Sequence, residues 1–214
     1  MPTTPYYGAY ARFSTPDKKE GSMLMGADNL VGDIYEIEYR VENGDQVPWL
    51  RNRFGKTVGF VEGEEAQELV LCRAKGWKTC AVLASVFYSS QPDPGIYWGE
   101  VALVCYPESE AESLDIFVQG ISNMLAEGNR PTVDLGQKGY DQVLAAKGAW
   151  LPTTTQKKYD LKPGQALVKD HRSFNENMIE LARKRHPGCM VVGWAFIITL
   201  VLGAIWLVKT LLGF

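Results

Sequence analysis

The chain has 214 residues, of which 46% are hydrophobic, and its formal net charge is −3. None of its four cysteines belongs to a CxxC pair and it has two histidines, so the composition disfavours a zinc site. Residues 1–152 carry 13 Lys and Arg against 21 Asp and Glu, a net of −8, whereas residues 153–188 carry a net of +4. The acidic charge of the first part opposes a broad phosphate-binding surface there.

The N-terminal half of the chain carries the signals of a β-rich unit. Residues 1–26 contain several aromatic residues without periodicity, and we interpret them as an N-terminal arm that becomes ordered on contact. A β-rich domain is predicted over 27–107. Apolar and polar residues alternate over 33–41, which predicts a half-buried strand. A short edge strand is predicted over 47–50, because Pro48 cannot donate a ladder hydrogen bond.

A helix and three more strands complete this domain. Residues 57–61 give a short strand signal, and apolar residues at helical spacing predict a helix that begins after Gly63 and ends at Gly76. Segments 79–88 and 97–106 are apolar on both faces, which predicts two strands in the centre of a sheet. The predicted fold class is α+β: a small, mostly antiparallel sheet or partly open barrel with one packed helix, followed by helices and a C-terminal transmembrane helix.

The second half of the chain has the pattern of helices. Residues 108–152 are predicted to form a helical extension, in which a capping box at Ser109-x-x-Glu112 begins a helix that ends at Gly128. A second helix is predicted over 137–147. Residues 153–188, the basic part of the chain, are interpreted as a juxtamembrane stalk that contains a helix.

The helix of the stalk is predicted from a second capping box, Ser173-x-x-Glu176, and runs to about residue 186. Its apolar residues recur at helical spacing and are predicted to face inward; they are Phe174, Met178, Leu181 and Ala182.

The last apolar segment is predicted to be a transmembrane helix. Residues 189–208 contain no charge, and a helix of that length rises about 30 Å, the thickness of the hydrocarbon core of a bilayer. With Lys209 the predicted segment is 189–209. The alternative is a helix buried in the core of a water-soluble protein. It is disfavoured because such helices are seldom apolar on all faces over this length. Because the N-terminus has no leader sequence, this pattern predicts a tail-anchored, single-pass membrane protein.

Two groups of residues are predicted to act at this membrane. Arg183, Lys184 and Arg185 precede the span, and only Lys209 follows it, so the positive-inside rule predicts a cytoplasmic N-terminal head. The same three residues are predicted to contact anionic lipid, with a purely topogenic role as the alternative. The small residues of the span that share one helix face are predicted to allow self-association or packing on a partner's span, with chance spacing as the alternative. They are Ala195, Thr199 and Gly203.

No set of residues converges on a catalytic motif. The sequence has no GxSxG, Walker or HExxH motif and no GxGxxG after a strand. Four carboxylates surround the start of the first predicted helix, where acidic side chains stabilise the helix dipole, and this role is favoured over an acid/base pair. They are Glu62, Glu64, Glu65 and Glu68. We therefore predict neither an enzyme nor a bound cofactor or metal.

Two stretches, LVGDIYEIEY and TVGFVEGEEAQEL, carry a resemblance to a known family. In the second, a strand that ends in Gly-aromatic-Val leads into a helix with Ala and Leu. Residues 30–106 resemble the HIRAN domain in these features, and the resemblance implies a small β-rich module that binds single-stranded DNA ends. Residues 51–55 stand where the family has an Asn-Pro-x-Asp turn. A basic-aromatic patch for nucleic acid would consist of Arg51, Arg53, Phe54 and Lys56, with a solvated turn as the alternative.

The sequence as a whole favours a protein that acts by binding. We predict a membrane-tethered adaptor or an accessory subunit of a membrane complex, with the lipid bilayer and either a protein partner or a second copy as its contacts. The alternative is a HIRAN-like binder of single-stranded nucleic acid that is tethered to the membrane.

Overall fold

The computed structural model describes residues 4–156, 159, 161–183 and 197–201. The chain divides into two compact units, Met1–Arg172 and Ser173–Phe214. The first unit is an α+β domain built on a large antiparallel sheet, which confirms that part of the predicted fold class but not the prediction that the sheet is small.

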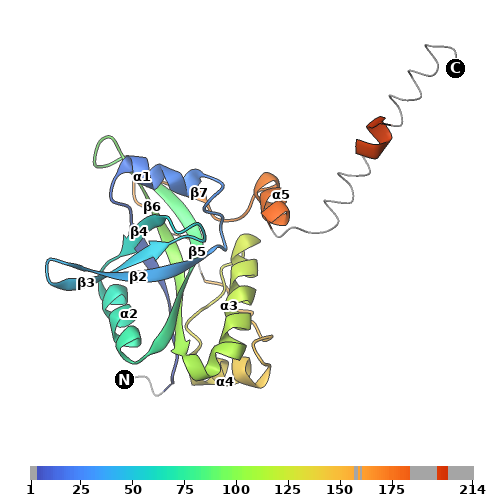
Figure 1. Cartoon of the computed structure of the whole chain (residues 1–214). Helices are drawn as coiled ribbons and strands as arrows, with labels where there is room; N and C mark the ends of the chain where they lie inside the picture. The colour runs from blue at the N-terminus through green and yellow to red at the C-terminus, as the bar shows by residue number, and fades with distance from the viewer. Residues whose placement is uncertain (1–3, 157–158, 160, 184–196, 202–214) are drawn as a thin grey trace, which may run out of the picture. The chain divides into compact units, whose positions relative to one another are not determined.

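Among the described residues, seven strands form one sheet in the order β2–β3–β4–β1–β6–β5–β7, and every pairing is antiparallel (Figure 1). Strand β2 also pairs with β5, at Ile34↔Val82 and Tyr35↔Ala81, so the sheet closes on itself and β7 extends β5 beyond the closure. The strands are β1 (Tyr7–Ser14), β2 (Ile34–Glu42), β3 (Asp45–Arg51), β4 (Thr57–Val61), β5 (Trp77–Ser89), β6 (Ile96–Pro107) and β7 (Gln165–Lys169).

Helices lie against this sheet in the first unit. Figure 1 shows α3 and α4 next to each other and α2 beside the β2–β3 hairpin. The helical elements of the first unit are α1 (Lys18–Ser22), the 3-10 turn η1 (Met23–Met25), α2 (Glu64–Ala74), the 3-10 turn η2 (Glu108–Glu110), α3 (Ala111–Ala126) and α4 (Gly136–Ala145). The helix predicted after Gly63 is thus confirmed as α2, and Gly63 has a φ of 78°, which lies in the left-handed region that favours glycine.

Strands β5 and β6 are buried on both faces, as their apolar sequences predict. Successive side chains of a strand point to opposite faces, so neighbouring residues enter different cores. Val82 of β5 lies in one core with Phe117 of α3, and Leu83 lies in the other with Leu69 of α2. A register shift between Leu83 and Ser85 interrupts the ladder with β6. The sheet therefore separates two hydrophobic cores.

Three local features differ from the sequence-based expectations. The predicted N-terminal arm contains β1, which pairs with β6 along its whole length and with β4 at Phe13 and Ser14. Strand β3 is flanked by both β2 and β4, so the prediction of an edge strand is wrong; Pro48 is tolerated because it pairs with β2 and lies outside the ladder with β4. The capping box at Ser109 is also wrong, because η2 occupies that position and the cap residue Glu110 makes no side-chain cap bond.

The prediction of a transmembrane helix over 189–209 is corrected. No helix in the described part of the chain is long and apolar enough to cross a membrane. Of the predicted segment, only residues 197–201 are described; they are helical and rise about 7.5 Å, against about 30 Å for a hydrocarbon core. The rest of the segment lies outside the described residues. The tail-anchored, single-pass topology depended on this helix and is therefore not supported.

The second unit begins with α5 (Phe174–Arg183). Its capping box is confirmed: the Ser173 amide donates to Glu176 Oε2 over 2.9 Å, and the Glu176 amide donates to Ser173 Oγ over 3.3 Å. The prediction that its apolar stripe faces inward is wrong. Phe174 is 78% exposed, Met178 48% and Leu181 40%.

Candidate functional site

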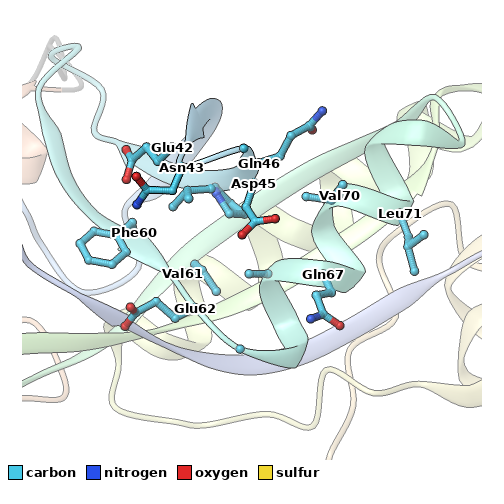
Figure 2. Close-up of a pocket in the computed structure, with 15 residues that line it drawn as sticks. Glu42, Asn43, Asp45, Gln46, Phe60, Val61, Glu62, Gln67, Val70 and Leu71 are labelled. Atoms are coloured by element: carbon cyan, nitrogen blue, oxygen red, sulfur yellow. The ribbon is translucent and has the colours of Figure 1, made fainter.

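A groove of about 770 Å³ lies between the β2–β3 hairpin, the end of β4 and α2 (Figure 2). This volume is within the range of small-molecule ligand pockets. Figure 2 shows the hairpin residues at the top, the residues of α2 to the right and the residues at the end of β4 to the lower left. The apolar side chains of its lining are Val47, Pro48, Phe60, Val61, Ala66, Val70 and Leu71.

The hairpin wall of the groove is fixed by its turn and by one tryptophan. Asn43 and Gly44 have φ values of 53° and 93°, the combination of positive angles that a two-residue type I′ turn requires. Trp49 Nε1 donates to Glu42 Oε1 over 2.6 Å, and the Trp49 ring lies 4.9 Å from that of Phe60. The Glu42 carboxylate is thereby held against Trp49, and Glu42 itself directly precedes the turn.

The opposite wall, α2, is anchored to β2 through Tyr39. The Tyr39 hydroxyl donates to the Leu69 carbonyl over 3.1 Å, and Arg73 lies 4.5 Å above the tyrosine ring. Burial raises the pKa of Tyr39 to about 12, against the smaller lowering effect of its hydrogen bond with Thr79. These contacts hold the inner face of α2 against the sheet, while Leu71, which is half exposed, lines the groove.

The electrostatic character of the groove is acidic. Glu42, Asp45 and Glu62 contribute three carboxylates, and none of the described residues that line the groove is Lys, Arg or His. Ser14 Oγ donates to Glu62 Oε2 over 2.9 Å, so one of these carboxylates is positioned by β1. The predicted helix-start role fits Glu64 and Glu65, which lie in the first turn of α2, whereas Glu62 lines the groove. An apolar floor under carboxylates suits a ligand with both apolar and cationic groups.

The predicted nucleic-acid patch lies on the loop between β3 and β4. Phe54 is half exposed, and each cation of the patch is close to a carboxylate. The pairs are Arg51 with Glu38 at 3.7 Å, Arg53 with Asp33 at 2.6 Å and Lys56 with Asp28 at 3.0 Å. A hydrogen bond from Arg40, together with the charges of Arg40 and Arg51, holds the pKa of Glu38 below its usual value. These carboxylates offset the positive charge that would attract phosphate.

The conformation of this loop depends on Asn52, which the sequence analysis did not single out. Its side-chain oxygen accepts from the amides of Phe54 and Lys56, each over 3.1 Å, and its amide nitrogen donates to the Asp28 carbonyl over 3.3 Å. An asparagine that hydrogen-bonds the backbone two residues further on is an Asx-turn, so the sequence Asn-x-x-Gly was the available signal. A second pocket of about 240 Å³, lined in part by Asn29 and Asn52, lies beside the loop.

Two basic residues from the end of the first unit join the same region. Lys169 Nζ donates to the Leu24 and Asn29 carbonyls, each over 3.3 Å. Arg172 Nη2 donates to Asp33 Oδ1 over 3.3 Å, and its Nε donates to the Val31 carbonyl over 2.6 Å. The sequence could not predict these contacts, because Lys169 and Arg172 lie about 140 residues from the carbonyl groups that they bind.

The remaining predicted site residues are only partly described. Arg183 ends α5, whereas Lys184 and Arg185 lie outside the described residues. Thr199 lies in the helical stretch 197–201, and Ala195 and Gly203 lie outside the described residues. Within the described ranges, no group of three or more His, Cys, Asp or Glu is arranged to hold a metal ion.

Comparison of the chain with models of protein families, with curated proteins and with solved structures found no match. The resemblance of residues 30–106 to the HIRAN domain therefore stays a prediction.

Proposed function

We propose that the protein acts by binding, as an adaptor or accessory subunit whose groove between the β2–β3 hairpin and α2 receives a segment of a protein partner. The observation that carries this proposal is the combination of an apolar floor with three carboxylates and no cation among the described lining residues. The segment that fits this chemistry has apolar side chains flanked by Lys or Arg.

The two parts of the groove would contribute differently. Apolar side chains such as Phe60 and Leu71 offer area that a bound segment removes from water, which is the main source of affinity. The carboxylates of Asp45 and Glu62 lie on exposed positions, so they would act chiefly on the association rate and on the choice of partner. An acidic groove on a unit that is acidic overall also repels acidic segments.

Reversing two carboxylates of the groove is expected to weaken binding of a basic-apolar peptide at least about tenfold, which corresponds to about 1.4 kcal/mol. The variant is Asp45→Lys with Glu62→Lys in the full-length protein. The probe is a fluorescent twelve-residue peptide in which Leu and Phe alternate with Lys, and the measurement is fluorescence anisotropy at several salt concentrations.

The matched control is Asp93→Lys with Glu127→Lys, which changes the net charge by the same amount at exposed positions outside the groove. It should leave the peptide affinity within about twofold of the unmodified protein. Equal losses in both variants would mean that the peptide responds only to net charge, and no binding by the unmodified protein would remove the proposal.

A second candidate function, binding of single-stranded nucleic acid, has one observation in its favour. Arg172 shares the carboxylate of Asp33 with Arg53, on the loop that carries the half-exposed Phe54. Aromatic side chains beside cations are the usual elements of single-strand binding. The carboxylates paired with this loop weigh against it.

We expect no salt-sensitive binding of a twenty-nucleotide single-stranded DNA at about 150 mM salt, because the patch cations face carboxylates. Affinity is measured by anisotropy from low to physiological salt, with the unmodified protein and with Arg51→Ala combined with Phe54→Ala. Tight binding that falls steeply with salt and is lost in this variant would establish the nucleic-acid function instead.

A further inference from the structure

We propose that the groove is occupied by α5 of a second copy of this chain, an inference that rests on the proposed function of the groove and names its partner. Its starting point is that the apolar stripe of α5 faces solvent. Phe174, Met178 and Leu181 are large apolar residues, and all three are exposed. An amphipathic helix normally turns such a stripe toward a core, so an exposed stripe indicates a missing contact.

The arrangement of residues around α5 separates its apolar and acidic groups. At about 100° per residue, Phe174, Met178 and Leu181 fall within about 60° of one another around the helix axis. Glu176 and Glu180 lie on the opposite side, and Glu180 is buried whereas the stripe is exposed. An acidic groove would therefore meet the apolar stripe of α5 without meeting its two glutamates.

Charge also favours this pairing. Lys184 and Arg185 follow α5 in the sequence, within a segment of net charge +4. Arg183 itself lies on the side of the two glutamates, 3.5 Å from Glu180, and does not contribute to the stripe. The groove contributes Asp45 and Glu62 with no cation among its described lining residues. The stripe thus has the composition that the groove requires: apolar side chains that precede a run of basic ones.

The contact would be heterologous, because it joins two different surfaces of the same chain. Each contact uses one α5 and one groove, so association either closes as a ring of two or more copies or continues as an open chain. A ten-residue helix buries a small interface, so the association is expected to be weak and dependent on concentration.

The test is a complementation experiment with two full-length variants, measured by sedimentation velocity from about 1 to 200 μM. Met178→Asp places a charge in the stripe and leaves the groove intact. Asp45→Lys with Glu62→Lys changes the groove and leaves α5 intact. Each variant alone should stay monomeric, whereas the two mixed in equal amounts should form a dimer, because one intact helix meets one intact groove.

Asn175→Asp is the control on α5, since it adds the same charge at an exposed position outside the stripe and should associate like the unmodified protein. Circular dichroism and the formation of the mixed dimer together show that the variants are folded. The inference is overturned if the unmodified protein is monomeric at all concentrations, or if the mixture does not form a dimer.

Two other outcomes would also contradict docking of α5 in the groove. If the groove variant still loses peptide binding but every variant associates alike, the docking of α5 fails and the proposed function of the groove stands. If association is unchanged and Met178→Asp alone abolishes cosedimentation with vesicles of phosphatidylcholine and phosphatidylserine in a 7:3 ratio, the stripe contacts lipid, and docking in the groove is equally overturned.

Discussion

Replacing Asp33 by asparagine is expected to lower the free energy of unfolding by about 3 kcal/mol, because it removes the charge that neutralises two arginines. The Asp33 side chain is only 2% exposed. Arg53 Nη2 lies 2.6 Å and Arg172 Nη2 lies 3.3 Å from Asp33 Oδ1, while the Leu30 amide donates to Asp33 Oδ2 over 2.9 Å. The Arg172 side chain is itself 9% exposed, so its charge would be left buried without its carboxylate.

The measurement is urea unfolding of the full-length protein, followed by tryptophan fluorescence. Asp28→Asn is the matched control, because Asp28 also pairs with a cation, Lys56, but both side chains are about half exposed. Its effect should stay below about 1 kcal/mol, as for other surface pairs. Equal effects of the two substitutions would mean that burial of the Asp33 cluster contributes nothing to stability.

Replacing Phe13 by alanine is expected to lower the free energy of unfolding by about 3–5 kcal/mol, the usual range for a fully buried phenylalanine. Phe13 of β1 has no exposed surface and lies in the core that includes Leu83. Its ring is packed against two glycines: a Cβ at Gly99 would come within 2.3 Å of the ring, and one at Gly59 within 2.7 Å. The core around this ring is therefore closely packed, so truncation leaves a cavity.

Phe54→Ala is the control for this substitution, since Phe54 is half exposed on a loop, and its effect should stay within about 0.5 kcal/mol. Both variants are measured by the same urea titration. If Phe13→Ala is as harmless as Phe54→Ala, the side chain of Phe13 contributes no essential packing to this core.

The outcome for β1 also bears on the groove. Ser14, the last residue of β1, donates to Glu62, and Phe13 pairs with Val61 in the ladder with β4. Both Val61 and Glu62 line the groove. Loss of β1 packing is therefore expected to alter the floor of the groove as well as the stability of the domain, and the peptide titration of Phe13→Ala would report it.

Part of the candidate site was readable from the sequence. The Asn43–Gly44 pair is a sequence signal for a two-residue hairpin turn, and both residues have the positive φ values that such a turn uses. The helix that becomes α2 was visible from its apolar spacing and from the glycines at its ends. The groove itself was not readable, because it forms only when the hairpin and α2 are placed on the same side of β4.

For the predicted basic patch, the sequence showed which cations are neighbours but not which carboxylates lie beside them. Arg53, Phe54 and Lys56 lie together on one loop, and Arg51 ends β3 directly before it. Their carboxylate partners come from other segments: Asp28 precedes β2, and Asp33 also binds Arg172, which is 139 residues away. A run of cations in sequence therefore gave no measure of the local net charge.

The sequence by itself determined the local elements: the alternating strands, the two doubly buried strands, α2 and the capping box of α5. Each depends on the periodicity of side chains within about ten residues, which can be read directly from the sequence. The tertiary structure alone decided which strands pair, since β1 joins β6 across about 90 residues and β2 closes the sheet on β5. It also decided that the stripe of α5 is exposed, because periodicity identifies an apolar face but not what covers it.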